Sequence, residues 1–119
     1  MTLRCLIVDD NAAFLEEAAE LLRREGLVVA GVASSGDEAL ERARELRPDV
    51  TLLDLMLGSE SGLEVARRLV EAGVDESSVI LISTHAEVDV ADLIEEAPVA
   101  GFVAKPELSA KAVRRLVDV

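Results

Sequence analysis

The sequence predicts an α/β protein in which five parallel strands alternate with five helices. Three observations predict this class. Five short apolar runs are spaced along the chain, each bounded by Gly, Pro or polar residues. Longer segments with apolar residues at helical spacing separate these runs. The runs are apolar throughout instead of alternating, which is typical of parallel strands covered by helices on both faces.

The elements follow from local patterns. The first predicted helix has an apolar face formed by Phe14, Leu15, Ala18, Leu21 and Leu22, and Gly26 ends it. The second begins at Ser35 and ends before Pro48, and the third runs from Ser61 to Gly73; both begin with a capping-box pattern of Ser and Glu. The predicted strands are residues 3–8, 27–32, 50–55, 79–83 and 100–104, and the last two helices are residues 87–96 and 109–117.

Right-handed crossovers between parallel strands would give a doubly wound sheet. For five βα units, (βα)₅, we expect the flavodoxin-like strand order 2-1-3-4-5, with a crevice between the carboxyl ends of strands one and three. We expect one domain over residues 1–119, because the sequence shows no linker or low-complexity tract.

Composition limits the classes of partner. The net charge of −12 disfavours direct binding to nucleic acids or anionic membranes. The one cysteine, Cys5, lies in the first apolar run and is expected to be a buried, inert thiol. No apolar stretch resembles a signal peptide or a membrane span, and we expect a cytoplasmic location.

Three carboxylates are predicted to meet at the crevice. Asp9 and Asp10 follow the first strand, and Asp54 interrupts the apolar run of the third. Such carboxylates repel one another, and a Mg²⁺ ion bound by oxygen ligands would relieve the repulsion. The alternatives are that Asp9 and Asp10 begin the first helix at its favourable end, and that Asp54 is a solvated strand end.

A hydroxyl and an ammonium group should reach the same edge. Ser83 ends the fourth strand and Lys105 ends the fifth. Taken singly, Ser83 could be a helix cap and Lys105 a surface residue. Together with the carboxylates they suit phosphoryl transfer, in which Asp54 is the nucleophile and cationic and hydroxyl groups stabilise the transferred group.

With these residues in place, the chain resembles a response-regulator receiver domain of two-component signalling, with a CheY-like fold, over essentially its whole length. The resemblance implies a phospho-acceptor, a Mg²⁺ site, groups that contact the phosphoryl group, and an aromatic switch residue. The phospho-acceptor would be Asp54, and the Mg²⁺ ligands would be Asp9, Asp10, Asp54 and the backbone carbonyl of Met56. Ser83 and Lys105 would contact the phosphoryl group. The switch would be formed by Ser83 together with the aromatic residue Phe102. It also implies a cis peptide bond between Lys105 and Pro106.

The resemblance further implies a histidine kinase or phosphotransfer protein as phosphoryl donor. It implies dimerisation or target binding through the face made by the fourth helix, fifth strand and fifth helix. The chain would be a signalling domain that catalyses only its own phosphorylation and dephosphorylation, and not an enzyme acting on other molecules. The sequence departs from the family in the loop after the acceptor, where Gly58 replaces a common Pro and Ser61-Gly62 replaces Asp-Gly.

Other classes fit less well. A phosphatase with an Asp nucleophile needs a second Asp two residues later, where this chain has Met56. A flavin-binding module needs a phosphate loop after the first strand, where Asp9 and Asp10 would repel phosphate. A receiver cut from a helix-turn-helix transcription factor stays open, since residues 101–117 resemble receivers that precede such output domains.

Overall fold

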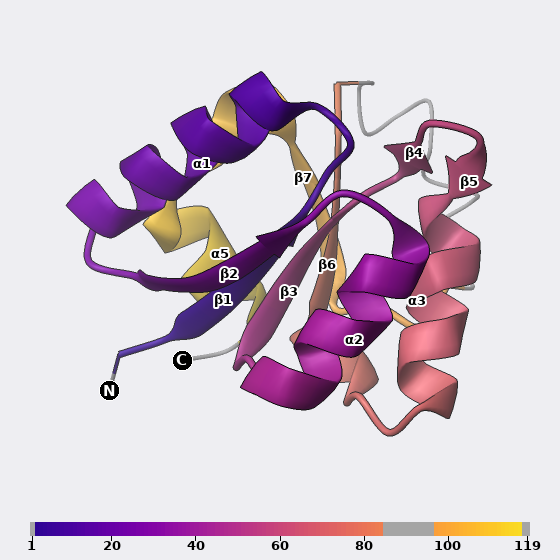
Figure 1. Ribbon diagram of the computed structural model, residues 1–119. Coiled ribbons are helices and arrows are strands. Elements are labelled where there is room, and N and C mark those ends of the chain that lie inside the picture. Colours follow the sequence, from indigo (N-terminus) through magenta and orange to yellow (C-terminus); the bar gives the residue numbers. More distant parts are fainter. Residues whose placement is uncertain (1, 85–96, 118–119) are drawn as a thin grey trace.

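The protein folds as a five-stranded parallel sheet with helices on both faces (Figure 1). The structure is a computed structural model and describes residues 2–84 and 97–117. The strands of the sheet are β1 (Arg4–Val8), β2 (Val28–Ala33), β3 (Val50–Asp54), β6 (Val79–Ser83) and β7 (Gly101–Ala104). The described α-helices are α1 (Ala12–Arg24), α2 (Gly36–Leu46), α3 (Gly62–Glu71) and α5 (Ala110–Val117).

The strands are ordered β2-β1-β3-β6-β7, and each neighbouring pair is parallel. Two short strands, β4 (Met56–Leu57) and β5 (Glu60–Ser61), form a separate antiparallel hairpin. Counted without this hairpin, the sheet has the predicted order 2-1-3-4-5, and the predicted fold class is confirmed. The carboxyl ends of β1 and β3 are therefore neighbours, as a switch-point crevice requires.

An apolar core lies on each face of the sheet. The first core joins α1 and α5 to the strands through side chains such as Leu22 and Val113. The second joins α2 and α3 to the opposite face through side chains such as Ala43 and Leu69. Cys5 is buried in the first core, and burial raises the pKa of its thiol to about 11, against a smaller lowering by Arg23. The thiol is therefore protonated at neutral pH, as expected of an inert cysteine.

The helix starts differ in how they are capped. The predicted cap of α2 is confirmed, because Ser35 Oγ accepts a hydrogen bond from Glu38 N at 3.2 Å. Ser61 is the N-cap residue of α3, as predicted, but the side-chain capping bond expected of it is absent. Instead, Gly62 N donates to the Leu55 carbonyl at 2.7 Å, so the residue directly after β3 accepts the hydrogen bond of the first amide of the helix. Local pattern could not show this, since the bond depends on the β4–β5 hairpin.

Two further expectations have definite outcomes. The Lys105–Pro106 peptide bond is trans, since no cis bond occurs among the described residues, and the expectation of a cis bond was wrong. These residues begin a short 3₁₀ turn, Lys105–Glu107, in which Pro106 is the second residue, where its missing N–H costs no helical hydrogen bond. The helix predicted over residues 87–96 lies outside the described residues. In the part of the chain that is described, no helix is long and apolar enough to cross a membrane.

Thr51 offers a test of the packing of β3. Its side chain is 1% exposed, and Oγ1 has no hydrogen-bond partner among the described residues. An unpaired buried hydroxyl costs about 1–3 kcal/mol, and Val has nearly the same shape without it. We expect Thr51→Val to raise the free energy of unfolding by about 1 kcal/mol, measured by urea denaturation. A variant less stable than the wild type would show that Oγ1 has a partner after all.

Candidate functional site

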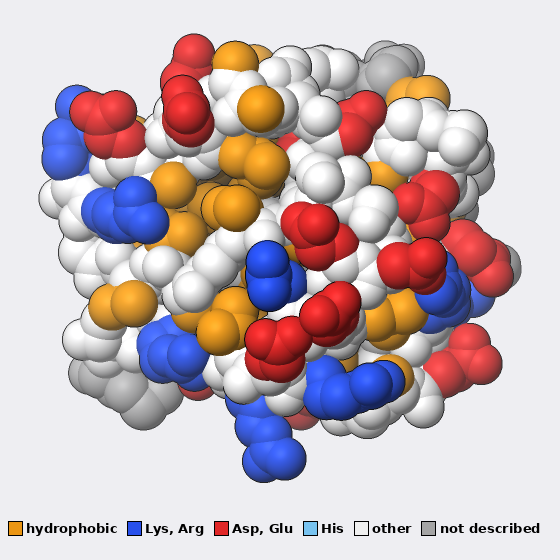
Figure 2. Space-filling model, in the orientation of Figure 1, with side chains coloured by type: hydrophobic (Ala, Val, Ile, Leu, Met, Phe, Trp, Pro, Cys, Tyr) orange, Lys and Arg blue, Asp and Glu red, His pale blue; other side chains and the backbone are white. Residues whose placement is uncertain are grey.

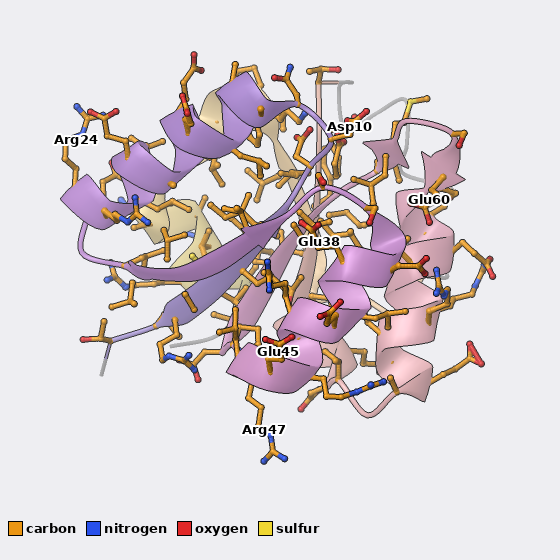
Figure 3. All side chains as sticks on the ribbon, viewed as in Figure 1. Asp10, Arg24, Glu38, Glu45, Arg47 and Glu60 are labelled. Carbon is orange, nitrogen blue, oxygen red and sulfur yellow. The ribbon has the colours of Figure 1, made fainter. Side chains whose placement is uncertain are left out.

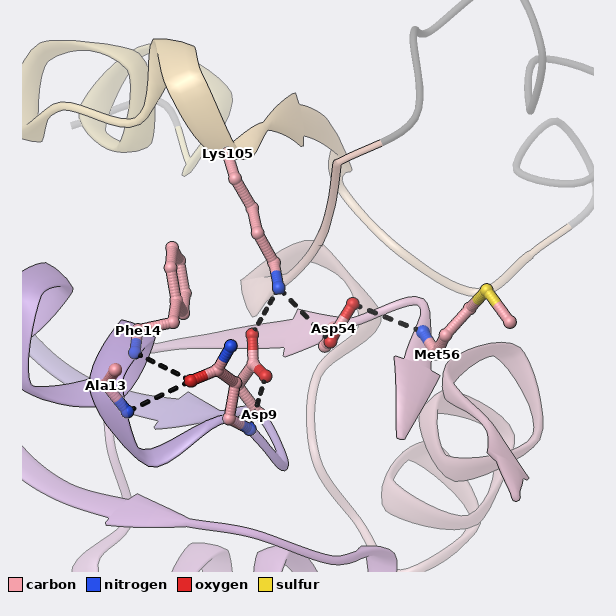
Figure 4. Close-up of polar contacts among 7 residues, drawn as sticks. Asp9, Ala13, Phe14, Asp54, Met56 and Lys105 are labelled. Atoms are coloured by element: carbon pink, nitrogen blue, oxygen red, sulfur yellow. Dashed lines mark hydrogen bonds and ion pairs between the residues drawn. The ribbon is translucent and has the colours of Figure 1, made fainter. Parts of the chain in front are cut away.

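The candidate site is built from residues at the carboxyl ends of four strands, and Figure 4 shows those at the ends of β1, β3 and β7. Asp9 directly follows β1, Asp54 ends β3, Ser83 ends β6, and Lys105 directly follows β7. Asp9 is fully buried, and Asp54 and Ser83 are 6% and 2% exposed. Parallel strands place these ends at one edge, so the sequence order alone brings the four side chains to the same region.

Asp9, Asp10 and Asp54 form an acidic cluster. One carboxylate oxygen from each lies within 4.8 Å of the others. Asp10 is exposed and lies at the edge of the sheet near β4 (Figure 3). Asp9 Oδ2 is buried and has no hydrogen bond of suitable geometry within the described chain, although it forms an ion pair with Lys105. A cluster of this kind, open on the Asp10 side and all-oxygen in its ligands, can hold a hard metal cation.

Lys105 bridges the two buried carboxylates. Its Nζ lies 2.6 Å from Asp9 Oδ2 and 3.3 Å from Asp54 Oδ2, and its side chain is 14% exposed. Burial by itself would lower the pKa of Lys105, but the close contact with Asp9, the hydrogen bond to Asp54 and the charges of both carboxylates outweigh burial and raise it. The ammonium group therefore stays charged and partly neutralises the cluster.

The carboxyl group of Asp54 has an unfavourable environment for its charge. Burial raises its pKa, and the charge of Asp9 raises it further. The backbone amide of Met56, 3.2 Å from Asp54 Oδ1, and the ammonium group of Lys105 oppose this rise without cancelling it. An ionised Asp54 is thus held in place by two donors and destabilised by its neighbour, which suits a group that gains from contact with a cation.

The Asp54 loop is held by a close backbone approach. Met56 and Leu57 pair with Ser61 and Glu60 in the β4–β5 hairpin, and the Met56 side chain is exposed. Gly62 packs so tightly behind Asp54 that a Cβ there would lie 2.8 Å from Leu55 Cα and closer still to the Asp54 carbonyl oxygen. The glycine singled out from the sequence is needed for this contact and not for a positive φ.

Ser83 and Phe102 lie on adjacent strands but at different depths. Asp54 is in register with Ile82, the residue before Ser83, and Ser83 is in register with Ala104, the residue before Lys105. Ser83 is thus brought to the edge that carries the carboxylates. Phe102 is in register with Leu81, is partly buried, and packs against the second core. Phe102 is the second residue of β7 and lies away from the carboxyl edge of the sheet.

Two residues in contact with this site were not predicted as part of it. The ring of Phe14 lies under Lys105, with Nζ 4.4 Å from the ring centroid. Asn11 caps α1, since its side-chain Oδ1 accepts hydrogen bonds from Ala13 N and Phe14 N. Its backbone N–H donates to Asp9 Oδ1 at 2.9 Å. The sequence signal was present in Asn11, a strong N-cap residue directly after the paired aspartates, which places Phe14 in the first turn of α1.

Two hollows in the described surface lie away from this chemistry. A cavity of about 650 Å³ lies at the opposite edge of the sheet, among residues such as Leu3, Arg47 and Asp75. Hydrophobic side chains also gather over α1 and β2, where Leu15 and Val32 line a shallow groove (Figure 2). Neither hollow contains any of the carboxylates of the acidic cluster or Lys105. The candidate reactive site is therefore the cluster itself.

The family model described as the response regulator receiver domain matches residues 5–117. The chain belongs to this family. Among the relatives of this receiver domain is the DNA-binding response regulator MtrA of Mycobacterium tuberculosis (strain ATCC 25618 / H37Rv), 38% identical over 122 residues, with 98% of this chain and 51% of MtrA covered. A solved two-component response regulator of the LuxR family from Aurantimonas sp. SI85-9A1 superposes with a TM-score of 0.85 at 27% identity, covering 99% of this chain and 86% of that one.

A further relative of the receiver domain is the protein-glutamate methylesterase/protein-glutamine glutaminase 6 of Anaeromyxobacter dehalogenans (strain 2CP-C). The two are 41% identical over 107 residues, which is 89% of this chain but 30% of that protein. The chain therefore spans about half, or less, of the length of these curated relatives. What the match shows is the shared receiver domain.

Proposed function

We propose that this receiver domain, a single domain over residues 1–119, accepts a phosphoryl group on Asp54 from a histidine kinase or phosphotransfer protein. The observation that carries the proposal is the meeting of three carboxylates and Lys105 at one edge of the sheet. Asp54 is the nucleophile because it is the carboxylate that both Lys105 and the Met56 amide contact. That the chain belongs to the receiver-domain family supports the role of phosphoryl acceptor for Asp54.

The metal is proposed to be Mg²⁺, held by Asp9, Asp10, Asp54 and the backbone carbonyl of Met56. The buried Asp9 Oδ2 and the nearby carboxylate oxygens support this ligand set. When bound, Mg²⁺ would neutralise charge on the cluster and on phosphoryl oxygens. The exposed position of Asp10 leaves one side of the cluster open to a cation from solvent.

The transfer forms one bond and breaks one. An oxygen of Asp54 attacks phosphorus, and the bond between phosphorus and the donor atom breaks as the donor leaves with the electron pair. Lys105 is proposed to pair with the phosphoryl oxygens, and Ser83 to donate its hydroxyl to one of them. Asp54 needs no proton removed, so the chain must mainly orient and neutralise charge.

Phosphorylation is proposed to shift a two-state equilibrium through Ser83 and Phe102. The register of β6 and β7 supports this, since Ser83 lies beside Ala104 and Phe102 lies two residues before it. Movement of Ser83 toward the phosphoryl group would change the packing of β7. The proposed output face consists of β7, α5 and the helix predicted over residues 87–96, and it would control a homodimer or a target protein.

A second candidate is that this domain is the receiver of a longer DNA-binding regulator. The observation that favours it is that the similarity to MtrA covers 51% of a protein described as a DNA-binding response regulator. The net charge of −12 makes direct nucleic-acid binding by this chain itself unfavourable. The native mass of the protein in its own cells would decide between the two candidates. Esterase activity is not proposed, because the match to the methylesterase covers only 30% of that enzyme.

Incubation with acetyl phosphate and Mg²⁺ tests the proposed function. We expect one phosphoryl group per chain by intact mass, because acetyl phosphate can replace the protein donor. Labelling should fall by at least about tenfold when EDTA replaces Mg²⁺, since charge neutralisation at the cluster is lost. A chain that stays unmodified with Mg²⁺ present, or that is labelled equally well with EDTA, would contradict the proposal.

A further inference from the structure

The ammonium group of Lys105 is enclosed by unlike partners. Asp9 and Asp54 contact it at 2.6 and 3.3 Å, while the Phe14 ring lies 4.4 Å from it by its centroid (Figure 4). From this geometry we infer that Phe14 is a positioning residue, whose ring holds Lys105 at the reactive edge of the sheet. The inference rests on the proposed function for its effect on phosphorylation, although the contact itself does not.

The ring is itself held in place by a short series of contacts. Asp9 Oδ1 accepts from Asn11 N at 2.9 Å, and Asn11 Oδ1 accepts from Phe14 N at 3.2 Å. The Phe14 ring then meets Lys105, whose Nζ returns to Asp9 Oδ2. The contacts therefore close a circuit from Asp9 through the α1 cap and back to Asp9. The cap fixes the first turn of α1, which carries Phe14, to Asp9 at the end of β1.

A plain packing role would not need a ring. Phe14 is partly buried against the first core, and a Leu side chain could fill much of the same volume. The face of an aromatic ring carries partial negative charge, which an aliphatic side chain lacks, and it attracts a cation most strongly when water is excluded. With its side chain only 14% exposed, Lys105 is in such a setting.

The Phe14 ring also differs from the carboxylates because a bound metal cation would not compete with Lys105 for it. A cation bound at the acidic cluster would compete with Lys105 for Asp9 Oδ2, the oxygen now 2.6 Å from Nζ. The ring binds no hard cation in this way, so its contact with Lys105 does not depend on the Asp9 Oδ2 oxygen. Phe14 would therefore keep the ammonium group near Asp54 when Asp9 is engaged elsewhere.

The contact can be measured without any phosphodonor. The sequence has two lysines, Lys105 and Lys111, and Lys111 is exposed on α5, so it is an internal reference. In protein labelled with ¹⁵N at lysine Nζ, we expect the ammonium protons of Lys105 to be shifted upfield of those of Lys111 by the Phe14 ring current. The upfield shift should persist in Phe14→Tyr and be lost in Phe14→Leu. A wild-type Lys105 signal with no upfield shift would overturn the inference.

The functional effect is measured on the same variants with acetyl phosphate and Mg²⁺. We expect Phe14→Leu to be labelled about three- to tenfold more slowly than the wild type and Phe14→Tyr to be labelled at nearly the wild-type rate. Equal rates for Phe14→Leu and wild type would overturn the positioning role. If Phe14→Leu fails to fold by circular dichroism, Phe14→Met takes its place, with the same expectations. If the wild type itself is not labelled, the proposed function fails, while the ring-current result still decides the contact.

Discussion

The Asp54→Asn variant is expected to fold like the wild type and to take up no phosphoryl group from acetyl phosphate and Mg²⁺. The amide is close in shape to the carboxylate but is not a competent nucleophile. We expect labelling by intact mass to fall below detection, a loss of at least about 10³-fold in rate. Its folding should not suffer, because the ionised carboxyl group is disfavoured by burial and by Asp9.

A matched control for this variant is Glu41→Gln. Glu41 is exposed on α2, so the change removes one negative charge far from the cluster. It should be labelled at the wild-type rate, which separates the loss of the nucleophile from a general change in charge. Asp54→Asn should also be no less stable than the wild type without Mg²⁺, measured by thermal unfolding. Labelling of Asp54→Asn at an undiminished rate would place the acceptor on another residue.

The second large effect is expected from Gly62→Ala. A Cβ at this position would lie 2.8 Å from Leu55 Cα and closer to the Asp54 carbonyl oxygen, and backbone atoms cannot rotate away as a side chain can. We expect the free energy of unfolding to fall by at least about 3 kcal/mol, measured by urea denaturation, because the α3 start must separate from the end of β3. The Asp54 loop would be displaced with it.

Gly73→Ala separates this contact from the conformational freedom of glycine. Gly73 has φ of +103° but no atom within 4 Å of its Cβ position, so its replacement should cost only the strain of the backbone, about 1–2 kcal/mol. We expect Gly62→Ala to be clearly the less stable of the two. If Gly62→Ala were as stable as the wild type, the close approach behind Asp54 would not be a feature of the folded protein.

Much of the fold could be predicted because its signals are local. The apolar runs at β3 and β6 are long enough and continuous enough to identify buried strands, and Ser35 and Glu38 identify the start of α2. The convergence of Asp9 and Asp54 then follows from parallel strand order. The start of α3 at Ser61 was predicted, but the hairpin β4–β5 and the capping contact of α3 could not be, since the backbone bond of Gly62 to Leu55 takes the place of the Ser61 side-chain cap.

The sequence by itself determined the sheet, its order and which side chains stand at its carboxyl edge, because periodicity and chain connectivity are properties of neighbours along the chain. Only the tertiary structure decided that Lys105 bridges Asp9 and Asp54 and that the ring of Phe14 lies against it. Phe14 and Lys105 are far apart in sequence, and the pattern of Phe14 is that of an ordinary core residue. Their contact depends on how α1 packs on the sheet, which is set by the first core and by the Asn11 cap.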